Sequence, residues 1–251
     1  ITDNNGCTAT DTISLTEPTD IQLSASSIPT SCFGGSNGKA IVSASGGVGP
    51  YTYLWNDPSF QTTDTATGLS ARFYWVLVTD SHGCVDSIST QVMEPVEIQT
   101  LMSSTQTSCP NSAGGSASVT IQSGGVGPFS YLWDDPTAQT TSTAINLTAR
   151  LYTVTVTDDS GCSVSDTVSV TAPNALVIST SKTDILCQGD ANGTATVTIS
   201  GGTAPFSIQW DDPLFQTTTT AVNLDSGRVI VEVQDDSGCF LFDTLFILEP
   251  A

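Results

Sequence analysis

The chain has 251 residues, of which 25 are acidic and only 5 are basic, so its net charge at pH 7 is −20. Nucleic acids and anionic membrane surfaces bind through basic patches, so this charge balance disfavours both as partners. Charged residues make up only 12% of the chain and Thr, Ser, Gly and Val are abundant, which is typical of short strands joined by turns rather than of helices.

The chain contains an internal repeat of about 78 residues. Residues 1–18 are interpreted as the C-terminal part of a preceding repeat, and three full copies are expected at 19–95, 96–173 and 174–251. Each copy has a cysteine near its start, here called the loop cysteine: Cys32, Cys109 and Cys187. Each also has one near its end, here called the hairpin cysteine: Cys84, Cys162 and Cys239. One tryptophan and one arginine also recur in each copy: Trp55, Trp133 and Trp210, with Arg72, Arg150 and Arg228.

Six short strands are predicted in the first full copy, bounded by Gly, Pro, Asn and Asp. Their predicted ranges are 21–26, 39–45, 51–55, 63–69, 72–80 and 85–93. In the second copy, Tyr152, Val154 and Val156 alternate with Leu151 and threonines, and this period of two indicates a half-buried strand. The predicted fold class is all-β, with tandem immunoglobulin-like β-sandwich repeats arranged end to end.

The recurring tryptophans lie at one strand position in every copy and are predicted to anchor the cores. Trp75 occurs in one copy only, and both a core and an exposed position remain open for it. The junctions between copies are short and contain proline, with one to three residues expected between the last strand of a copy and the first strand of the next. Such junctions predict a semi-rigid string of domains.

The cysteines predict disulfides and therefore an oxidising compartment, because the chain has no CxxC pair and its single histidine disfavours a zinc site. If every strand reverses direction, the loop and hairpin cysteines of one copy lie at the same end of the sandwich. This path predicts the pairs Cys32–Cys84, Cys109–Cys162 and Cys187–Cys239. Cys7 corresponds to Cys84 and is expected to be unpaired here, with its partner outside this chain.

The pattern of a loop cysteine, a "GG…GP(Y/F)" turn, an aromatic strand ending in Trp, and a "VTD–small–GC" hairpin resembles the SprB repeat of Bacteroidota surface adhesins, including those of gliding cells. The resemblance covers the whole chain, although the arginine before the fifth strand departs from the usual family pattern. It implies export by the type IX secretion system, an extracellular location at the cell surface, and contact with the secretion and motility machinery of the outer membrane.

The resemblance favours a non-catalytic stalk that holds a distal adhesive region away from the cell and transmits force, with other parts of the parent protein meeting extracellular surfaces or polysaccharide. One alternative is a set of carbohydrate- or surface-binding modules, for which Trp75 and Phe60 are the aromatics to inspect. Another is a spacer of a secreted hydrolase, because the hairpin is also similar to polycystic-kidney-disease-type domains. No catalytic residues are predicted: His82 is the only histidine, and the acidic pairs recur on turns. No apolar segment approaches the ~20 residues that span a membrane, so no membrane insertion is expected.

Calcium is the one candidate cofactor, because Ca²⁺ takes six to eight oxygen ligands including carboxylates. On the predicted path, acidic turns of each copy share one end of the sandwich, with Asn56 beside them in the first copy. The alternative is that these side chains bond their own backbone. The candidate metal ligands are Asp57, Asp80, Asp134, Asp135, Asp158, Asp159, Asp211, Asp212, Asp235 and Asp236.

Two further side-chain sets are singled out by the pattern. The three recurring arginines are expected to pair with a carboxylate or to cover the sandwich rim. Triplets of Asp, Thr or Ser, and an apolar residue resemble the O-glycosylation signal of Bacteroidota, although strand alternation generates the same pattern. The hydroxyl residues in these triplets are Thr12, Thr65, Ser87, Thr167 and Thr244.

Overall fold

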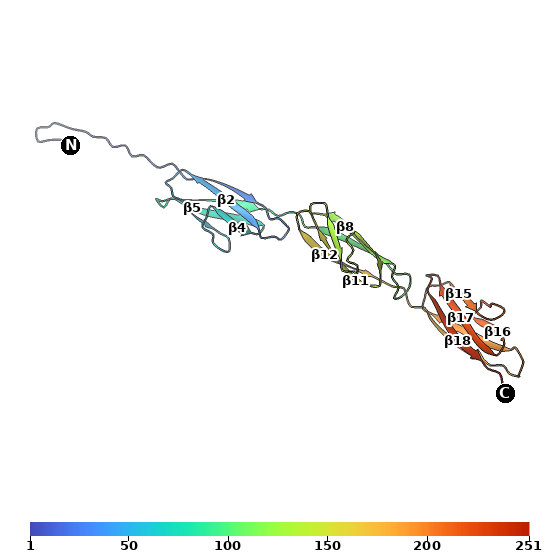
Figure 1. Cartoon of the computed structure of the whole chain (residues 1–251). Helices are drawn as coiled ribbons and strands as arrows, with labels where there is room; N and C mark the ends of the chain where they lie inside the picture. The colour runs from blue at the N-terminus through green and yellow to red at the C-terminus, as the bar shows by residue number, and fades with distance from the viewer. Residues whose placement is uncertain (251) are drawn as a thin grey trace. The chain divides into compact units, whose positions relative to one another are not determined.

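A computed structural model describes residues 1–250 of the chain. The chain divides into two compact units, Ile1–Glu97 and Ile98–Ala251. Across the described residues, all regular secondary structure is β-strand, as the composition predicts (Figure 1). Three separate hydrophobic cores are present, one in the first unit and two in the second.

The first unit contains one sandwich made of two three-stranded antiparallel sheets. One sheet has the spatial order β1 (Gln22–Ile28), β2 (Gly38–Ser45), β4 (Thr65–Leu69). The other has the order β3 (Thr52–Trp55), β5 (Arg72–Thr79), β6 (Val85–Val92). The six predicted strands are confirmed, and their ends lie within two residues of the predicted ones.

The second unit contains two further sandwiches with the same strand order. The second sandwich has the sheets β7 (Gln99–Thr105), β8 (Gly115–Ser123), β10 (Thr143–Leu147) and β9 (Ser130–Trp133), β11 (Arg150–Thr157), β12 (Ser163–Val170). The third has the sheets β13 (Val177–Thr183), β14 (Gly193–Ser200), β16 (Thr220–Leu224) and β15 (Phe206–Trp210), β17 (Gly227–Asp235), β18 (Phe240–Ile247). The immunoglobulin-like sandwich predicted from the sequence is therefore the observed fold class.

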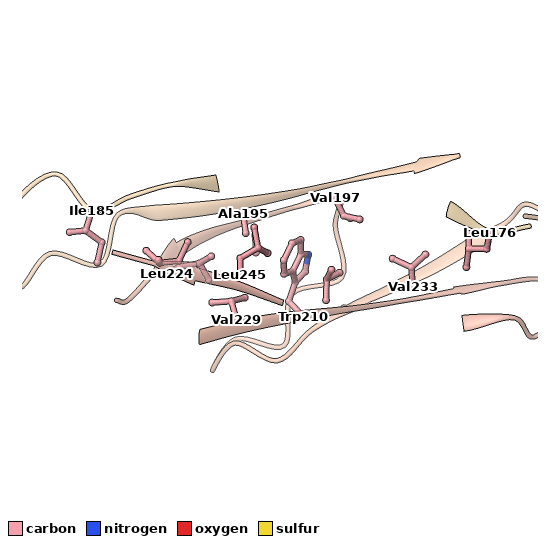
Figure 2. Close-up of a cluster of buried hydrophobic side chains, with 12 residues drawn as sticks. Leu176, Ile185, Ala195, Val197, Trp210, Leu224, Val229, Val233 and Leu245 are labelled. Carbon is pink, nitrogen blue, oxygen red and sulfur yellow. The ribbon is translucent and has the colours of Figure 1, made fainter. Parts of the chain in front are cut away.

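Each core lies between its two sheets and is organised around the recurring tryptophan. Trp55, Trp133 and Trp210 are at most 1% exposed, which confirms the predicted anchors. Figure 2 shows Trp210 between Ala195 and Val197 on one side and Val229 and Val233 on the other. The indole N–H of each tryptophan donates to a backbone carbonyl eight residues later, as Trp210 does to Thr218 at 2.9 Å. This bond satisfies the one polar atom that burial of an indole leaves.

The strand directions differ from the predicted path at one connection. In the second sandwich β7 and β12 run parallel, because Thr100 contacts Asp166 and Ser104 contacts Ser169. The antiparallel pairings of β8 with β7 and β10, and of β11 with β9 and β12, then make β9 and β10 run in the same direction. The chain passes from one sheet to the other between these strands without reversing. The loop after β7 and the hairpin before β12 therefore lie at opposite ends of the sandwich.

The junction between the second and third sandwiches is longer than predicted. Residues 171–176 separate β12 from β13, against the one to three residues expected. The segment is nevertheless held at both ends, because Thr107 N–H donates to the Thr171 carbonyl at 2.9 Å and Gly202 N–H to the Ala175 carbonyl at 3.2 Å. Leu176 also packs into the third core. The stretch between the two hydrogen-bonded residues, Thr171 and Ala175, is therefore shorter than the whole segment between the strands.

Residues 1–18 form no named strand, although they contain one closed turn. Thr2 and Thr8 form an isolated antiparallel bridge, and Asp3 N–H donates to the Cys7 carbonyl at 3.0 Å. The same backbone bond closes the hairpin of each full repeat, as Asp235 N–H to Cys239 carbonyl at 2.9 Å illustrates. The structural likeness of Cys7 to the hairpin cysteines agrees with the sequence alignment.

Candidate functional site

The hairpin between the last two strands of each repeat is built around a buried aspartate. In the third repeat, Asp235 accepts from Cys239 N–H at 2.8 Å with one carboxylate oxygen and from Thr203 N–H at 3.0 Å with the other. Asp80 and Asp158 make the equivalent bonds to Val48 and Val126, which lie in the turn before the third strand of their repeats. The aspartate thus fixes the hairpin cysteine and ties the hairpin to a neighbouring turn.

In the first and second repeats, hydrogen bonding to the hairpin carboxylates Asp80 and Asp158 favours their charged form. The Val48 N–H contributes most to Asp80 and lowers the pKa of its carboxyl. Burial opposes ionisation of Asp158, but N–H groups of Val126 and Cys162 outweigh it and also lower the pKa. Asp80 and Asp158 therefore stay ionised as structural acceptors near neutral pH.

A second buried aspartate lies in the connection that changes sheets. Asp135 accepts from Gln139 N–H at 2.8 Å and from Thr137 N–H at 3.0 Å, and Asp57 and Asp212 make the equivalent bonds. The Gln139 side chain continues to β10, donating to the Ile145 carbonyl and accepting from Ile145 N–H, both at 3.0 Å. This Asp–Gln pair therefore holds the connection against the strand that follows it.

The glutamines are functional residues that the sequence interpretation missed. Gln61, Gln139 and Gln216 follow their aspartates at a spacing of four in every repeat, and this recurrence was the available signal. Burial opposes ionisation of Asp57, Asp135 and Asp212, yet side-chain and backbone donors outweigh it and lower the pKa of all three. In the second repeat the Thr137 hydroxyl also donates to Asp135, and the pKa of Asp135 falls to about 2.

The predicted gathering of acidic turns at one end of each sandwich is wrong. Asp134 accepts from Thr153 N–H at 3.0 Å, part-way along β11, whereas Asp158 follows the end of that strand. The two positions are five strand residues apart, so roughly 16 Å separates them. One cation cannot bind both carboxylates at that distance. Asn56 and Asp211 make the same bond to Trp75 and Ile230. Among residues 1–250, no three His, Cys, Asp or Glu side chains come together as a metal site.

The acidic residues that directly follow the hairpin aspartates are held in the turn through their backbone. Asp159 and Asp236 donate their backbone N–H groups to Val126 and Thr203 carbonyls at 2.9 Å. The alternative weighed from the sequence, in which turn aspartates bond their own backbone, describes the structure.

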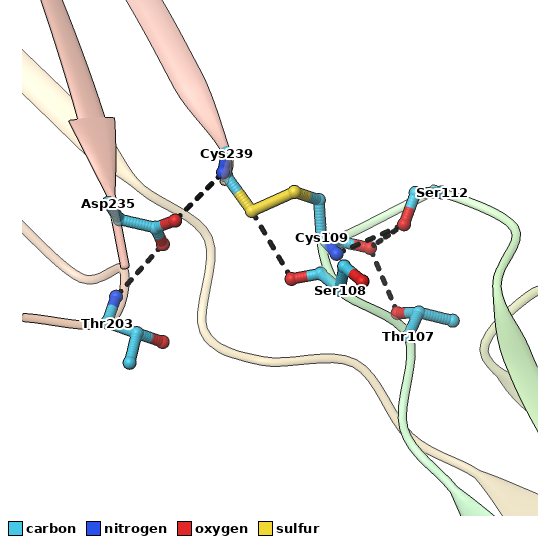
Figure 3. Close-up of a disulfide and its surroundings, with 7 residues drawn as sticks. All are labelled: Thr107, Ser108, Cys109, Ser112, Thr203, Asp235 and Cys239. Carbon is cyan, nitrogen blue, oxygen red and sulfur yellow. Dashed lines mark hydrogen bonds between the residues drawn. A yellow bond between two sulfur atoms is a disulfide. The ribbon is translucent and has the colours of Figure 1, made fainter. Parts of the chain in front are cut away.

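A disulfide joins the second repeat to the third, and the predicted pairing within repeats is wrong. Cys109, in the loop after β7, is bridged to Cys239, in the hairpin before β18, with Cα atoms 5.6 Å apart. Figure 3 shows the bridge beside Ser108, whose carbonyl oxygen lies 3.3 Å from the Cys239 sulfur. A pocket of about 310 Å³ adjoins it, lined by Pro110, Leu176, Phe240 and Leu241 among others. The cause is the sheet change between β9 and β10, which sends the two cysteines of one repeat to opposite ends.

The other cysteines fall into two groups. Cys32 and Cys162 are also disulfide-bonded. Cys7, Cys84 and Cys187 are free thiols, and all three are exposed. The free state of Cys84 and Cys187 excludes the predicted pairs Cys32–Cys84 and Cys187–Cys239, and the Cys109–Cys239 bridge excludes Cys109–Cys162.

The arginines are less regular than the sequence alignment suggests. Arg72 and Arg150 lie over the rings of Tyr74 and Tyr152, at 4.5 and 3.9 Å from the ring centres. Arg150 also pairs with Asp134 at 3.4 Å, so for this arginine the carboxylate partner expected from the sequence is confirmed. Arg228 pairs in register with Phe246, whereas Gly227 pairs with Ile247 as Arg150 does with Val170. Arg228 is therefore one position out of line: two residues precede β17 as two precede β11, and Gly227 occupies the position of Arg150.

Exposed aromatic residues gather on the outer face of one sheet in the first repeat. Phe73 and Trp75 alternate along β5 with the buried Tyr74 and Val76, and are 65% and 47% exposed. Leu54 on β3 has the same outward orientation. Phe60 is 65% exposed in the connection that follows β3. Trp75 is therefore a surface residue rather than part of the core.

The five predicted O-glycosylation residues occupy different environments. Ser87, Thr167 and Thr244 are exposed on the last strand of their repeats, Thr12 is exposed in the N-terminal segment, and Thr65 is half-buried on β4. Asp166 and Asp243 of these triplets accept from Thr100 at 2.8 Å and Thr180 at 2.6 Å on the first strand of the same repeat. The aspartates therefore have a structural role, and glycosylation stays a prediction.

Comparison with solved structures finds tandem immunoglobulin-domain proteins at low similarity. The chain is similar to Sidekick-1 immunoglobulin domains 1–5, with 11% identity and a TM-score of 0.33, over 93% of this chain and 60% of that one. It is also similar to the tetra-tandem repeat in the extending region of a large adhesion protein, with 14% identity, a TM-score of 0.28, and coverage of 90% and 73%. The chain is also similar to invasin, a bacterial integrin-binding protein, with 17% identity and a TM-score of 0.32, over 91% of this chain and 60% of that one.

No curated protein sequence matches the chain. Among residues 1–250, no helix has the length and apolar character needed to cross a membrane. A family model does match, at residues 24–60, 102–138 and 179–215, which run from the first strand of each sandwich to the sheet-changing connection. The description of that family is the SprB repeat, which this chain therefore matches three times.

Proposed function

We propose that this chain is a non-catalytic, force-bearing segment of the stalk of a secreted cell-surface adhesin. The observation that supports it best is the Cys109–Cys239 bridge, which joins two successive sandwiches by a second covalent link beside the chain connection. A stalk that bears load must resist extension, and a disulfide between neighbours supplies this resistance directly. The SprB repeats of the chain support the adhesin assignment.

The bridge changes how the second unit responds to tension. When its ends are pulled apart, tension passes from Cys109 to Cys239 through the sulfur atoms and bypasses the intervening residues. Strands β8 to β17 lie inside the bypassed segment, and only β7 and β18 lie outside it. Both are edge strands of their sheets. Tension can therefore detach two edge strands at most, while both tryptophan cores stay closed to extension.

Single-molecule pulling tests this mechanism. Handles are attached to the full chain at position 96, through a non-natural residue in place of the exposed Val96, and at the C-terminus. Reduction of the bridge releases a segment with a sequence separation of 130, which adds about 450 Å of extension at ~3.5 Å per residue. The oxidised protein is expected to lack this length, and the double variant Cys109→Ser, Cys239→Ser is expected to show it without reductant.

One control variant and one contrary result complete this experiment. Variant Cys187→Ser, in which a free thiol is removed, serves as the control and should extend like the oxidised parent. An oxidised parent that releases the full length at ordinary unfolding forces would refute the force-bearing role.

The exposed aromatic face of the first repeat favours a second candidate, a carbohydrate-binding module. Phe73 and Trp75 present stacking surfaces of the kind that sugar rings bind. Pull-down of the full chain on insoluble polysaccharides, compared with variant Trp75→Ala, tests it. Binding that depends on Trp75 supports the module, and equal retention of both proteins contradicts it. A spacer role beside a secreted hydrolase has no comparable support from these residues.

The location and partners follow from the same proposal. Disulfides form in oxidising compartments, so the bridged cysteines favour an extracellular place for the chain. We infer that other parts of the parent protein contact the target surface and the outer-membrane secretion and motility machinery. Intact mass of the protein purified from its native host tests the predicted O-glycans, because a mass equal to that of the bare chain would exclude them.

A further inference from the structure

We propose that Cys84 and Cys187 are half-sites for disulfides to additional SprB repeats, so that a bridge forms at every junction where one repeat follows another. This inference goes beyond the proposed function and does not depend on whether the chain bears force. The occupant of each half-site is the matching cysteine of another SprB repeat placed end to end with this one.

The bridged pair defines the rule. Cys109 is a loop cysteine of one repeat, and Cys239 is the hairpin cysteine of the repeat that follows it. Cys32 and Cys162 are also disulfide-bonded. Cys32 is a loop cysteine with a repeat after it in the sequence, and Cys162 is a hairpin cysteine with a repeat before it. Cys187 is the loop cysteine with no repeat after it in this chain, and Cys84 is the hairpin cysteine with no full repeat before it. These two are free.

The free hairpin cysteine has the same local structure as its bridged counterpart. Cys84 N–H donates to Asp80 Oδ1 at 2.9 Å, as Cys239 N–H does to Asp235 Oδ1 at 2.8 Å. The return bond from the aspartate N–H to the cysteine carbonyl is 2.9 Å in both. Cys84 is therefore held in the arrangement that places Cys239 within reach of a preceding repeat.

The free loop cysteine also matches its bridged counterpart. The Cys187 carbonyl accepts from Asp190 N–H at 3.1 Å, and the Cys109 carbonyl accepts from Ser112 N–H at 3.2 Å. Two residues before each cysteine, Ile185 and Thr107 donate their N–H groups at 2.9 Å to the residue that follows the last strand, Leu248 and Thr171. Cys187 is thus presented at the end of the third sandwich as Cys109 is at the end of the second.

The chemistry is thiol–disulfide exchange with a small-molecule disulfide, such as oxidised glutathione, as the oxidant. The Cys187 thiolate attacks one glutathione sulfur, forming a mixed disulfide and releasing one glutathione thiolate. The hairpin thiolate of the added repeat then attacks the Cys187 sulfur and releases the second glutathione. Two cysteine thiols and one oxidised glutathione thus give one protein disulfide and two reduced glutathiones.

The test adds one repeat to the full chain. Residues 96–173 are joined after Pro250, which recreates the "EPVEIQ" junction found at the start of the second repeat. After refolding in glutathione buffer, free thiols are alkylated and mapped by peptide mass spectrometry. We expect Cys187 to lose its label and to appear bridged to the added copy of Cys162, while the added copy of Cys109 takes the label instead.

Three comparisons make the result decisive. Serine at the added copy of Cys162 should restore labelling of Cys187. A bridge between the two cysteines of the added repeat, or a labelled Cys187 in a folded extended chain, would overturn the proposal. If the added repeat does not fold, as judged by hydrogen exchange of its tryptophan strand, the mirror extension decides. In it, residues 96–173 replace residues 1–18, and Cys84 is expected to bridge the added loop cysteine; a labelled Cys84 there overturns the proposal.

Discussion

The second and third repeats share a tryptophan-centred core and the same buried carboxylates but differ in the groups around them. Arg150 in the second repeat lies over Tyr152 and pairs with Asp134. At the register positions of Arg150 and Tyr152, the third repeat has Gly227 and Val229. The second repeat also has a hydroxyl donor to its connection aspartate, Thr137, where the third has Leu214.

This difference separates what the fold requires from what an individual repeat adds. The tryptophan, the Asp–Gln pair and the hairpin aspartate occur in both repeats and occupy equivalent positions. The arginine over the tyrosine is absent from one repeat, and that repeat still forms the same two sheets. Removal of a shared group should therefore harm both repeats equally, and removal of an added group should harm the second repeat alone.

The largest expected effect is loss of the shared tryptophan. Trp133→Ala and Trp210→Ala should each destabilise their own repeat by about 3 to 5 kcal/mol, because each removes a large, fully buried side chain. Hydrogen exchange followed by mass spectrometry measures each repeat separately. Trp75→Ala is the matched control, since this exposed indole should change stability by no more than about 0.5 kcal/mol. Very unequal costs at Trp133 and Trp210 would show that the two cores are not equivalent.

The next effect concerns pH and is specific to the second repeat. The pKa of Asp135 is lowered from 3.8 to about 2 in the folded protein, so the ionised carboxylate contributes stability at neutral pH, roughly 2 kcal/mol. This stability is present above the unfolded pKa, and it is lost as the pH falls from about 4 through about 2. Urea unfolding of the full chain at pH 5, 3 and 2, with exchange resolved by repeat, measures the loss.

Thr137 provides the sharper form of this experiment. Thr137→Val removes the hydroxyl donor and should raise the pKa of Asp135, so the second repeat should be less stable at neutral pH and should lose less stability as the pH falls from about 4 to about 2. Leu214→Thr adds a hydroxyl at the equivalent place and is the converse variant. An acid response unchanged by Thr137→Val would mean that the backbone and Gln139 donors alone set this pKa.

A smaller effect is expected from Arg150. Arg150→Ala should cost the second repeat about 1 kcal/mol, because an exposed cation–π contact and a surface ion pair each contribute little. Arg228→Ala in the third repeat is the control and should have almost no effect. Thermal unfolding at low salt and at about 1 M salt separates the charge contribution from the stacking contribution.

The smallest expected effect is that of calcium. The carboxylates proposed as ligands accept N–H donors and lie in two groups along each sandwich. Melting temperatures in millimolar Ca²⁺ and in chelator should therefore coincide for both repeats. A calcium-dependent increase of several degrees would contradict this account of the turns.

The sequence predicted the elements of the fold well, because each depends on local patterns. Alternation along residues 150–157, glycine and proline between strands, and recurrence of Trp55, Trp133 and Trp210 located the strands and the cores. The glutamine of the Asp–Gln pair recurs in every repeat, but a glutamine side chain does not by itself indicate a particular role. Its role depends on the backbone of a strand six residues later.

The sequence by itself thus determined the repeats, the strands and the residues that fill each core, since side-chain period and turn chemistry are local properties. Only the tertiary structure decided which cysteines meet. A turn and a sheet change look alike in sequence, yet one reverses the chain and the other does not. Because β9 and β10 run in the same direction, the two cysteines of the second repeat lie at opposite ends, and Cys109 meets Cys239 of the following repeat rather than Cys162 of its own.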